Sequence, residues 1–274
     1  MPNKPLVSPA GRDNEGKNGV QSLDIGMTIL RAIGSGHRAM MLKDIAAAVD
    51  MPASKVHRYM VSLVRSGMVE QDPMTSRYDL GPFALNLGLV AVDRLDRVKL
   101  GLAAIADLRD EVNQTTALAI WSDNGPIIVR SVRPFRPFRP ITVHVVTGTA
   151  MHLLTSACGR VFAACLPRSV TEARIRCEQD SLSLPAELKT PAGLAAMLDQ
   201  VQQQGVAIVD DDHRVPGVAA AAAPVYHFKH SITLCLMVIG VKGVIDLSPD
   251  ATVVSALKRS AQALSMRLGH SSPR

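Results

Sequence analysis

The chain has 274 residues, of which 47% are hydrophobic and 20% charged, and its net charge is +6. This length exceeds what one small domain usually needs, so we expect two globular domains with real cores. No apolar run reaches the roughly 20 residues that span a bilayer, which excludes a membrane-spanning class. Residues 1–20 are polar, contain Pro and Gly, and lack the apolar centre of a signal peptide. They predict a disordered tail on a soluble, cytoplasmic protein without membrane contact.

The four cysteines lie far apart, without a CxxC pair, at Cys158, Cys165, Cys177 and Cys235. This spacing is typical of buried thiols in a reducing compartment, and it argues against structural zinc, whose ligands come in close pairs. We expect neither a metal nor a cofactor. The positive charge permits a polyanionic partner, but residues 1–81 hold 10 Lys and Arg against 8 Asp and Glu. A nucleic-acid interaction must therefore rest on how the charges are arranged.

Residues 21–81 predict three helices followed by a β-hairpin. The first helix runs from Gln21 to Ile33, with Ser22 placed to cap its start. Its apolar residues at helical spacing are Leu23, Met27, Leu30 and Ile33. A short second helix covers residues 42–49 and ends at an Asp50-Met51-Pro52 turn. The third follows at once, over residues 53–66.

The third helix is amphipathic. One face is expected to pack inward through Val56, Met60, Leu63 and Val64, and the opposite face carries Ser54, Lys55, Arg58, Ser62 and Arg65. Hydroxyls and cations on the free face of such a helix are what a reader of the DNA major groove needs. Lys55 and Arg58 are the best contact candidates. His57 lies at the edge of the inward face, so packing and DNA contact are equally open for it.

Residues 67–81 form the expected hairpin, with two short strands around an Asp72-Pro73 turn. Arg77 lies beside its tip, where a cation reaches a phosphate or the minor groove. Together these features predict a winged helix-turn-helix over residues 21–81. Its predicted DNA-binding residues are Ser54, Lys55, His57, Arg58, Ser62 and Arg77. A small helical protein-interaction module is the alternative.

Motifs in both halves of the chain resemble one known family. They are Asp44-Ile45-Ala46 and the runs 51–60, 63–67, 77–81, 151–160, 205–217, 223–225 and 264–269. Their order and spacing resemble the IclR family of bacterial transcriptional regulators over residues 21–269. The resemblance implies double-stranded operator DNA and a small-molecule effector as partners. One departure is Asp50, where the family commonly has Gly; Asp tolerates the left-handed conformation that this turn requires.

The second half predicts an α+β domain. Residues 81–112 read as helix, so we expect a helical linker over 82–100, then an effector-binding domain over 101–270 that the resemblance implies to be GAF-like. Such a linker helix needs a partner, which predicts a homodimer or a tetramer. Strands are expected over residues 116–121, 127–132, 141–146, 206–209, 218–225 and 232–241, and helices over 156–166, 191–204 and 251–268. The fold class is thus a mixed α/β two-domain protein.

The effector site is predicted partly from chemistry and partly from the resemblance. Backbone N–H groups of Ser156, Ala157 and Cys158 precede a helix, where they are placed to bind a carboxylate. The resemblance implies this same loop, together with Asp210 or Asp211, Ala220, Met237 and Ile239. Family members that bind very small oxo-acids carry hydroxyls on the last strand; Met and Ile there imply an aromatic or longer aliphatic carboxylic acid. Met237 and Ile239 also fit plain core packing, and Trp121 fits either a pocket wall or the core.

Two further features complete the sequence. Residues 133–140 repeat Arg-Pro-Phe and predict an extended, polyproline-like loop, either a plain linker or an anion- or subunit-binding loop. Enzyme motifs such as GxSxG, GxGxxG and HExxH are absent, which argues against an enzyme, although Cys158 near His152 would suit a thiol nucleophile and its base. The sequence therefore predicts a ligand-responsive regulator, repressor or activator, of a catabolic operon.

Overall fold

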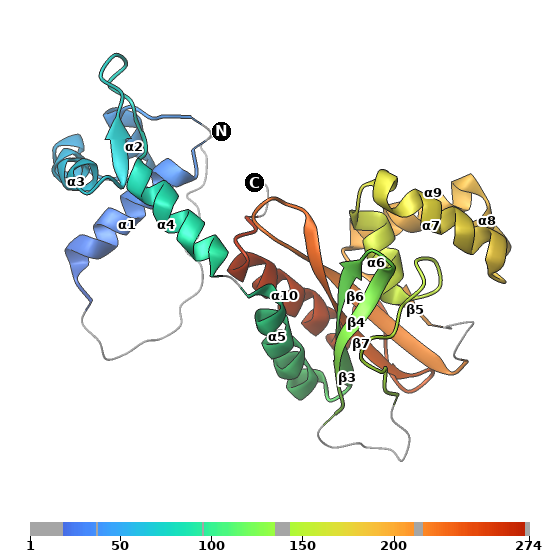
Figure 1. The fold of residues 1–274 in the computed structure, drawn as a ribbon. Helices are drawn as coiled ribbons and strands as arrows, with labels where there is room; N and C mark the ends of the chain where they lie inside the picture. The colour runs from blue at the N-terminus through green and yellow to red at the C-terminus, as the bar shows by residue number, and fades with distance from the viewer. Residues whose placement is uncertain (1–18, 37, 95, 135–142, 211–215, 272–274) are drawn as a thin grey trace, which may run out of the picture. The chain divides into compact units, whose positions relative to one another are not determined.

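The computed structural model describes residues 19–36, 38–94, 96–134, 143–210 and 216–271. The chain divides into two compact units, residues 1–95 and 96–274 (Figure 1). The tail expected over residues 1–20 lies outside the described residues except for its last two positions. The Arg-Pro-Phe repeat also lies outside them, apart from Arg133 and Pro134.

The N-terminal unit is a three-helix core with a two-stranded wing and a following helix. Its elements are α1 (Gln21–Gly34), α2 (Leu42–Ala48), α3 (Ala53–Arg65), β1 (Val69–Gln71), β2 (Tyr78–Leu80) and α4 (Pro82–Asp93). The antiparallel wing pairs Val69 with Leu80. Its buried core joins the helices to the wing through Ile29, Ile33, Ile45, Ala46, Val56, Met60, Val69 and Tyr78. The winged helix-turn-helix is confirmed.

The inward face of α1 differs from the prediction. Leu23 and Met27 are 63% and 43% exposed, and the buried residues are Gly26, Ile29 and Ile33. Both sets fit helical spacing, so only packing against α2 and the wing decides between them. Two smaller predictions are also wrong. Ser22 does not cap α1, which begins after Val20 without a side-chain cap. Val64 on α3 is 39% exposed.

The turn between α2 and α3 carries Asp50, a departure from the family pattern. Asp50 adopts a left-handed conformation with φ of 51°. That is the region in which Gly is easiest to place and Asp is tolerated better than most other residues. The turn therefore keeps its geometry without a glycine, as the sequence predicts.

The C-terminal unit is an α+β domain built on one antiparallel sheet. Its strands are β3 (Thr115–Ser122), β4 (Gly125–Val132), β5 (Ala207–Val209), β6 (Val218–Tyr226) and β7 (Ile232–Val241), in the spatial order β4-β3-β7-β6-β5. Its helices are α5 (Arg97–Val112), α6 (Ala157–Cys165), α7 (Arg168–Ser181), α8 (Ala186–Lys189), α9 (Pro191–Gln204) and α10 (Thr252–Arg267). In Figure 1, α5 and α10 cover one face of the sheet and α6 to α9 lie on the other. The predicted α+β class is confirmed.

The secondary structure of this part of the chain differs from the sequence prediction in several elements. The helix expected over residues 81–112 is two helices, because α4 ends at Asp93 and Asp96 caps α5 by accepting a hydrogen bond from Lys99 N at 2.9 Å. Residues 143–146, the described part of an expected strand, form none. Helices α7 and α8 were not expected, since α7 is rich in charged residues and has a weak apolar pattern. None of the helices in the described ranges is long and apolar enough to cross a membrane.

Histidines gather where the β6–β7 turn meets the end of α10. The ring of His270 stacks on Tyr226 at 5.1 Å and contacts His230 edge-on at 4.9 Å. Burial and the positive charges of Arg97 and Lys229 lower the pKa of His227, and burial with the neighbouring His230 lowers that of His270. The folded domain therefore favours neutral imidazoles here.

This cluster predicts that acidification destabilises the protein. As the pH falls through the ordinary histidine pKa of about 6.5, the unfolded chain binds protons before the folded one, so unfolding becomes easier. We expect the melting temperature to fall between about pH 7.5 and about pH 5.5, and His270→Gln to flatten this slope. Differential scanning calorimetry measures both. An unchanged slope in the variant would contradict the prediction.

Candidate functional site

The outward face of α3 presents the predicted DNA contacts. Ser54, Lys55, His57, Arg58 and Ser62 are all exposed, while Val56 and Met60 are buried beneath them. The exposure of His57 removes the packing alternative that the sequence left open. The helix thus holds two cations and three further polar side chains on one accessible surface, because its apolar residues anchor the opposite face in the core.

Arg77 on the wing is exposed and also hydrogen-bonded to the helical part of its domain. Its Nη1 donates a hydrogen bond to the carbonyl oxygen of Ala39 at 3.0 Å, next to a bridge between Met40 and Tyr78. The base of the wing is closed by Gly81, where an added Cβ would lie 2.3 Å from the carbonyl oxygen of Gly67. The wing is therefore held against the helices, with the remaining N–H groups of Arg77 available to a phosphate.

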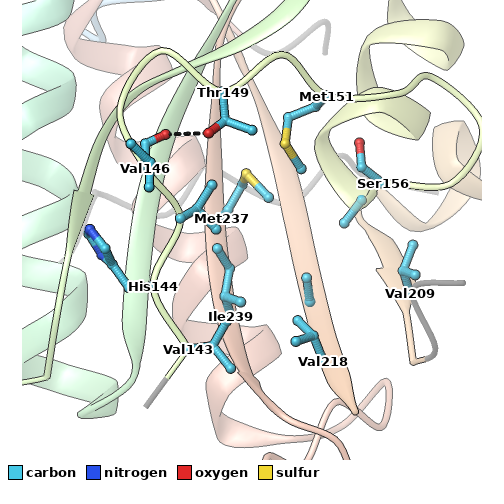
Figure 2. Close-up of a pocket in the computed structure, with 13 residues that line it drawn as sticks. Val143, His144, Val146, Thr149, Met151, Ser156, Val209, Val218, Met237 and Ile239 are labelled. Carbon is cyan, nitrogen blue, oxygen red and sulfur yellow. Dashed lines mark hydrogen bonds between the residues drawn. The ribbon is translucent and has the colours of Figure 1, made fainter. Parts of the chain in front are cut away.

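The C-terminal unit contains a cavity of about 290 Å³ on the α6 face of its sheet. One wall is formed by β5, β6 and β7, another by the start of α6, and a third by the segment 143–151 (Figure 2). The lining residues are Val143, His144, Val145, Val146, Thr149, Met151, Ser156, Ala157, Val209, Val218, Ala220, Met237 and Ile239. Most of them are aliphatic or thioether side chains, so the cavity suits an apolar molecule.

Five predicted effector residues meet in this cavity: Ser156, Ala157, Ala220, Met237 and Ile239. Three do not line it. Trp121 packs its ring against Phe162 at 5.8 Å, Cys158 is fully buried, and Asp210 is exposed. Its neighbour Asp211 lies outside the described residues.

The prediction missed the whole segment from Val143 to Met151 and two aliphatic residues on the sheet. The missed residues are Val143, His144, Val145, Val146, Thr149, Met151, Val209 and Val218. The apolar run over 141–146 was visible in the sequence, but it indicated a strand. Nothing in the sequence predicted that this run would line the same cavity as residues of β6 and β7.

The hydroxyl groups of the cavity are already paired within the protein. Ser156 Oγ donates to the carbonyl oxygen of His152 at 2.6 Å and accepts from Gly159 N at 3.0 Å. Thr149 Oγ1 donates to the carbonyl oxygen of Val146 at 2.7 Å (Figure 2). The remaining polar features of the described wall are the imidazole of His144 and the start of α6, whose first backbone N–H groups have no partner within the helix and carry partial positive charge.

Cys158 does not have the properties of a nucleophile. Burial raises the pKa of its thiol to about 11, so the group is protonated at neutral pH. His152 Nδ1 instead faces Glu178 Oε1 at 3.5 Å. Cys158 and His152 therefore belong to the packing around α6. They do not form the nucleophile and base that a thiol enzyme would need.

A winged helix-turn-helix followed by an α+β domain with an internal cavity defines a two-domain DNA-binding protein. The family model for the IclR helix-turn-helix domain matches residues 22–73, and that for the bacterial transcriptional regulator IclR C-terminal domain matches residues 90–266. The chain belongs to the IclR family of bacterial transcriptional regulators. It is thus a transcriptional regulator and not an enzyme.

Known proteins resemble the chain over nearly its full length. The crystal structure of Pseudomonas aeruginosa HmgR is 33% identical, with a TM-score of 0.83, covering 93% of this chain and 100% of that one. The glycerol operon regulatory protein of Streptomyces griseus is 31% identical over 258 residues, covering 91% of this chain and 97% of its own. The regulator TtgV of Pseudomonas putida is 31% identical over 215 residues, covering 77% and 78% respectively.

Proposed function

We propose that the protein is a ligand-responsive regulator of a catabolic operon, which binds its operator as a homodimer and takes a small aromatic or longer aliphatic carboxylic acid as effector. The apolar cavity beside the start of α6 is the observation that carries this proposal. Its place of action is the cytoplasm, where bacterial DNA lies. A relative named for a glycerol operon supports control of a catabolic operon.

The cavity matches an acid with an apolar body. Met151, Met237 and Ile239 surround the hydrocarbon part, and thioethers adapt to ligands of irregular shape. We place the carboxylate against the backbone N–H of Ala157 at the start of α6, where the helix dipole favours negative charge. Such an acid gains affinity from buried hydrocarbon and orientation from one anionic end.

The exposed face of α3 is the proposed reader of the operator. Arg58 and Lys55 are placed to bind base edges or phosphates in the major groove, with Ser54, His57 and Ser62 beside them. Arg77 on the wing is the proposed contact to the flanking phosphate or minor groove. Reader and wing together cover one half-site.

Exposed apolar residues on α4 support the homodimer. Phe83, Leu85, Leu87, Leu89 and Val90 are between 45% and 64% exposed on this one helix. An apolar surface of this kind on a helix is typical of a protein–protein interface, and a second copy of the chain gives the two-fold pair of readers that a two-half-site operator needs.

The double variant Leu85→Glu/Leu89→Glu is expected to be monomeric at micromolar concentration and to bind the operator at least tenfold more weakly. Charged groups on this surface oppose its burial, and a monomer loses the effective concentration that links two half-sites. Analytical ultracentrifugation measures the assembly. The matched control Asn86→Glu adds charge to the same exposed helix without removing apolar surface. A double variant that remains dimeric would contradict the role of α4.

A gel-shift titration tests the proposed function. Purified protein is titrated into DNA from upstream of its own gene. The titration is then repeated in the presence of aromatic and aliphatic carboxylic acids. We expect a specific complex whose affinity changes with one class of acid. In Ala220→Phe, which fills the cavity, the complex is expected to persist and the response to vanish. If no specific complex forms, a genome-wide binding selection finds the target. If acids act equally on Ala220→Phe, the cavity is not the effector site.

A further inference from the structure

A buried carboxylate on α7 lies behind the wall of the effector cavity. Glu178 is 5% exposed, and its two oxygens accept hydrogen bonds from backbone N–H groups: Oε1 from Leu153 at 2.8 Å and Oε2 from Leu154 at 3.0 Å. A buried charge is stable only when its hydrogen-bonding capacity is met, which this bidentate arrangement achieves. Both of its oxygens thus bind the backbone of residues 153–154, and Oε1 also faces His152 Nδ1 at 3.5 Å.

Residues of α6 and its N-cap also form hydrogen bonds with the segment 152–154 that Glu178 contacts. Arg160 Nε donates to the carbonyl oxygen of Leu154 at 2.9 Å, and Ser156 Oγ donates to that of His152 at 2.6 Å. Gly159 packs so closely that an added Cβ would lie 1.8 Å from the same His152 oxygen. Residues 152–154 are therefore fixed between α6 and α7.

This fixed segment joins two residues of the cavity wall. Met151 precedes it and Ser156 follows it, and both line the cavity, whereas Glu178 does not. Any displacement of the backbone at Leu153 and Leu154 thus moves a thioether of the wall and the start of α6 together. The carboxylate acts on the cavity only through the backbone that it holds.

We propose that Glu178 is a positioning residue for the effector cavity. It sets Met151 and the start of α6 against the β6–β7 wall, so that the apolar pocket and the helix N-terminus bind the same ligand at once. The inference rests on the proposed function for the role of the cavity, and it extends that function to a helix that contributes no residue to the cavity.

The variant Glu178→Gln is the sharpest test, because it keeps the shape and replaces one acceptor oxygen with an N–H donor. That donor then faces a backbone N–H, and one of the two hydrogen bonds is lost. Glu178→Asp keeps the charge but is one methylene shorter, so we expect a smaller effect of the same kind. The matched control is Glu172→Gln on the same helix, since the side chain of Glu172 is 46% exposed and pairs with Arg176.

Hydrogen–deuterium exchange on the full-length proteins gives the first readout, without any ligand. We expect the amides of Leu153 and Leu154 to exchange roughly tenfold faster in Glu178→Gln than in wild type, and β6 and β7 to keep their protection. Glu172→Gln is expected to match wild type at these amides. Unchanged exchange at residues 153–154 in Glu178→Gln would overturn the proposal. If Glu178→Gln fails to fold, Glu178→Asp takes its place.

Ligand binding gives the second readout, with 2-naphthoate, phenylacetate and octanoate as probes in isothermal titration calorimetry. For any acid that binds wild type, we expect roughly tenfold weaker binding to Glu178→Gln and an unchanged affinity in Glu172→Gln. Equal affinity in Glu178→Gln and wild type would overturn the positioning role. If no acid binds wild type, the proposed effector class is wrong, and the exchange experiment decides the role of Glu178 alone.

Discussion

Arg58→Ala is expected to lower specific operator affinity by a hundredfold or more while leaving the fold intact. The side chain is exposed on α3, so truncation removes no packing. A well-placed arginine contact to a base edge contributes about 2 kcal/mol, and the proposed homodimer would lose that contribution at both half-sites. Fluorescence anisotropy at fixed salt measures the affinity for operator DNA and for a shuffled sequence, and circular dichroism checks the fold.

The matched control for this prediction is Arg267→Ala, which removes the same charge from an exposed position at the end of α10. It is expected to keep operator affinity within about twofold, because a charge outside the reading helix adds only to the salt-dependent attraction. Normal operator affinity in Arg58→Ala would refute α3 as the reader. An equal loss in both variants would mean that the measured binding is nonspecific.

Gly159→Ala is expected to destabilise the C-terminal domain by about 3 kcal/mol or more, the upper end of what overpacking a core costs. An added Cβ would lie 1.8 Å from the carbonyl oxygen of His152 and 2.7 Å from Leu153 Cα. These neighbours are backbone atoms, and they are held in place because Leu153 N donates a hydrogen bond to Glu178 and Ser156 Oγ donates one to the His152 carbonyl oxygen. Chemical denaturation monitored through Trp121, the one tryptophan of the chain, reports on this domain.

The control is Gly26→Ala in α1, whose unfolding is followed by circular dichroism because Trp121 lies in the other unit. Gly26 is also helical and buried, but no atom lies within 4 Å of an added Cβ. Ala in an unobstructed helix stabilises it, by about 0.5–1 kcal/mol relative to Gly. We therefore expect opposite signs from the same chemical change. A change of less than about 1 kcal/mol in the free energy of unfolding of Gly159→Ala would show that the loop at His152 moves to accommodate the added methyl group.

The difference between the two glycines illustrates the limits of sequence reasoning. Helical periodicity does not distinguish Gly159 from Gly26, because the contact that forbids a side chain comes from the loop at His152 and Leu153, whose path over the helix is set by tertiary packing. The same holds for α1, where Leu23 and Ile29 fit equally good periodic patterns and packing alone exposes the former and buries the latter.

The effector cavity was predictable in part. Residues 156–157 were found because a helix start has its own anion chemistry, and Ala220, Met237 and Ile239 because the family resemblance marked their strands. The wall from Val143 to Met151 was not found, since an apolar run predicts a strand and says nothing about which strands it crosses. Cys158 and Asp210 follow the lining residues Ala157 and Val209 directly, and neighbours in sequence of a pocket residue often point into the core or the solvent. Trp121, which fits either a pocket wall or the core by sequence, packs against Phe162.

The sequence by itself determined the family, the winged helix-turn-helix, the α+β class and the accessible cations of α3, because each follows from local periodicity, turn chemistry or motif spacing. Only the tertiary structure decided which apolar faces are buried, and that Glu178 on an unexpected helix binds the backbone between two residues of the cavity wall. These features depend on contacts between residues far apart in the chain, and a local pattern carries no information about its distant partner.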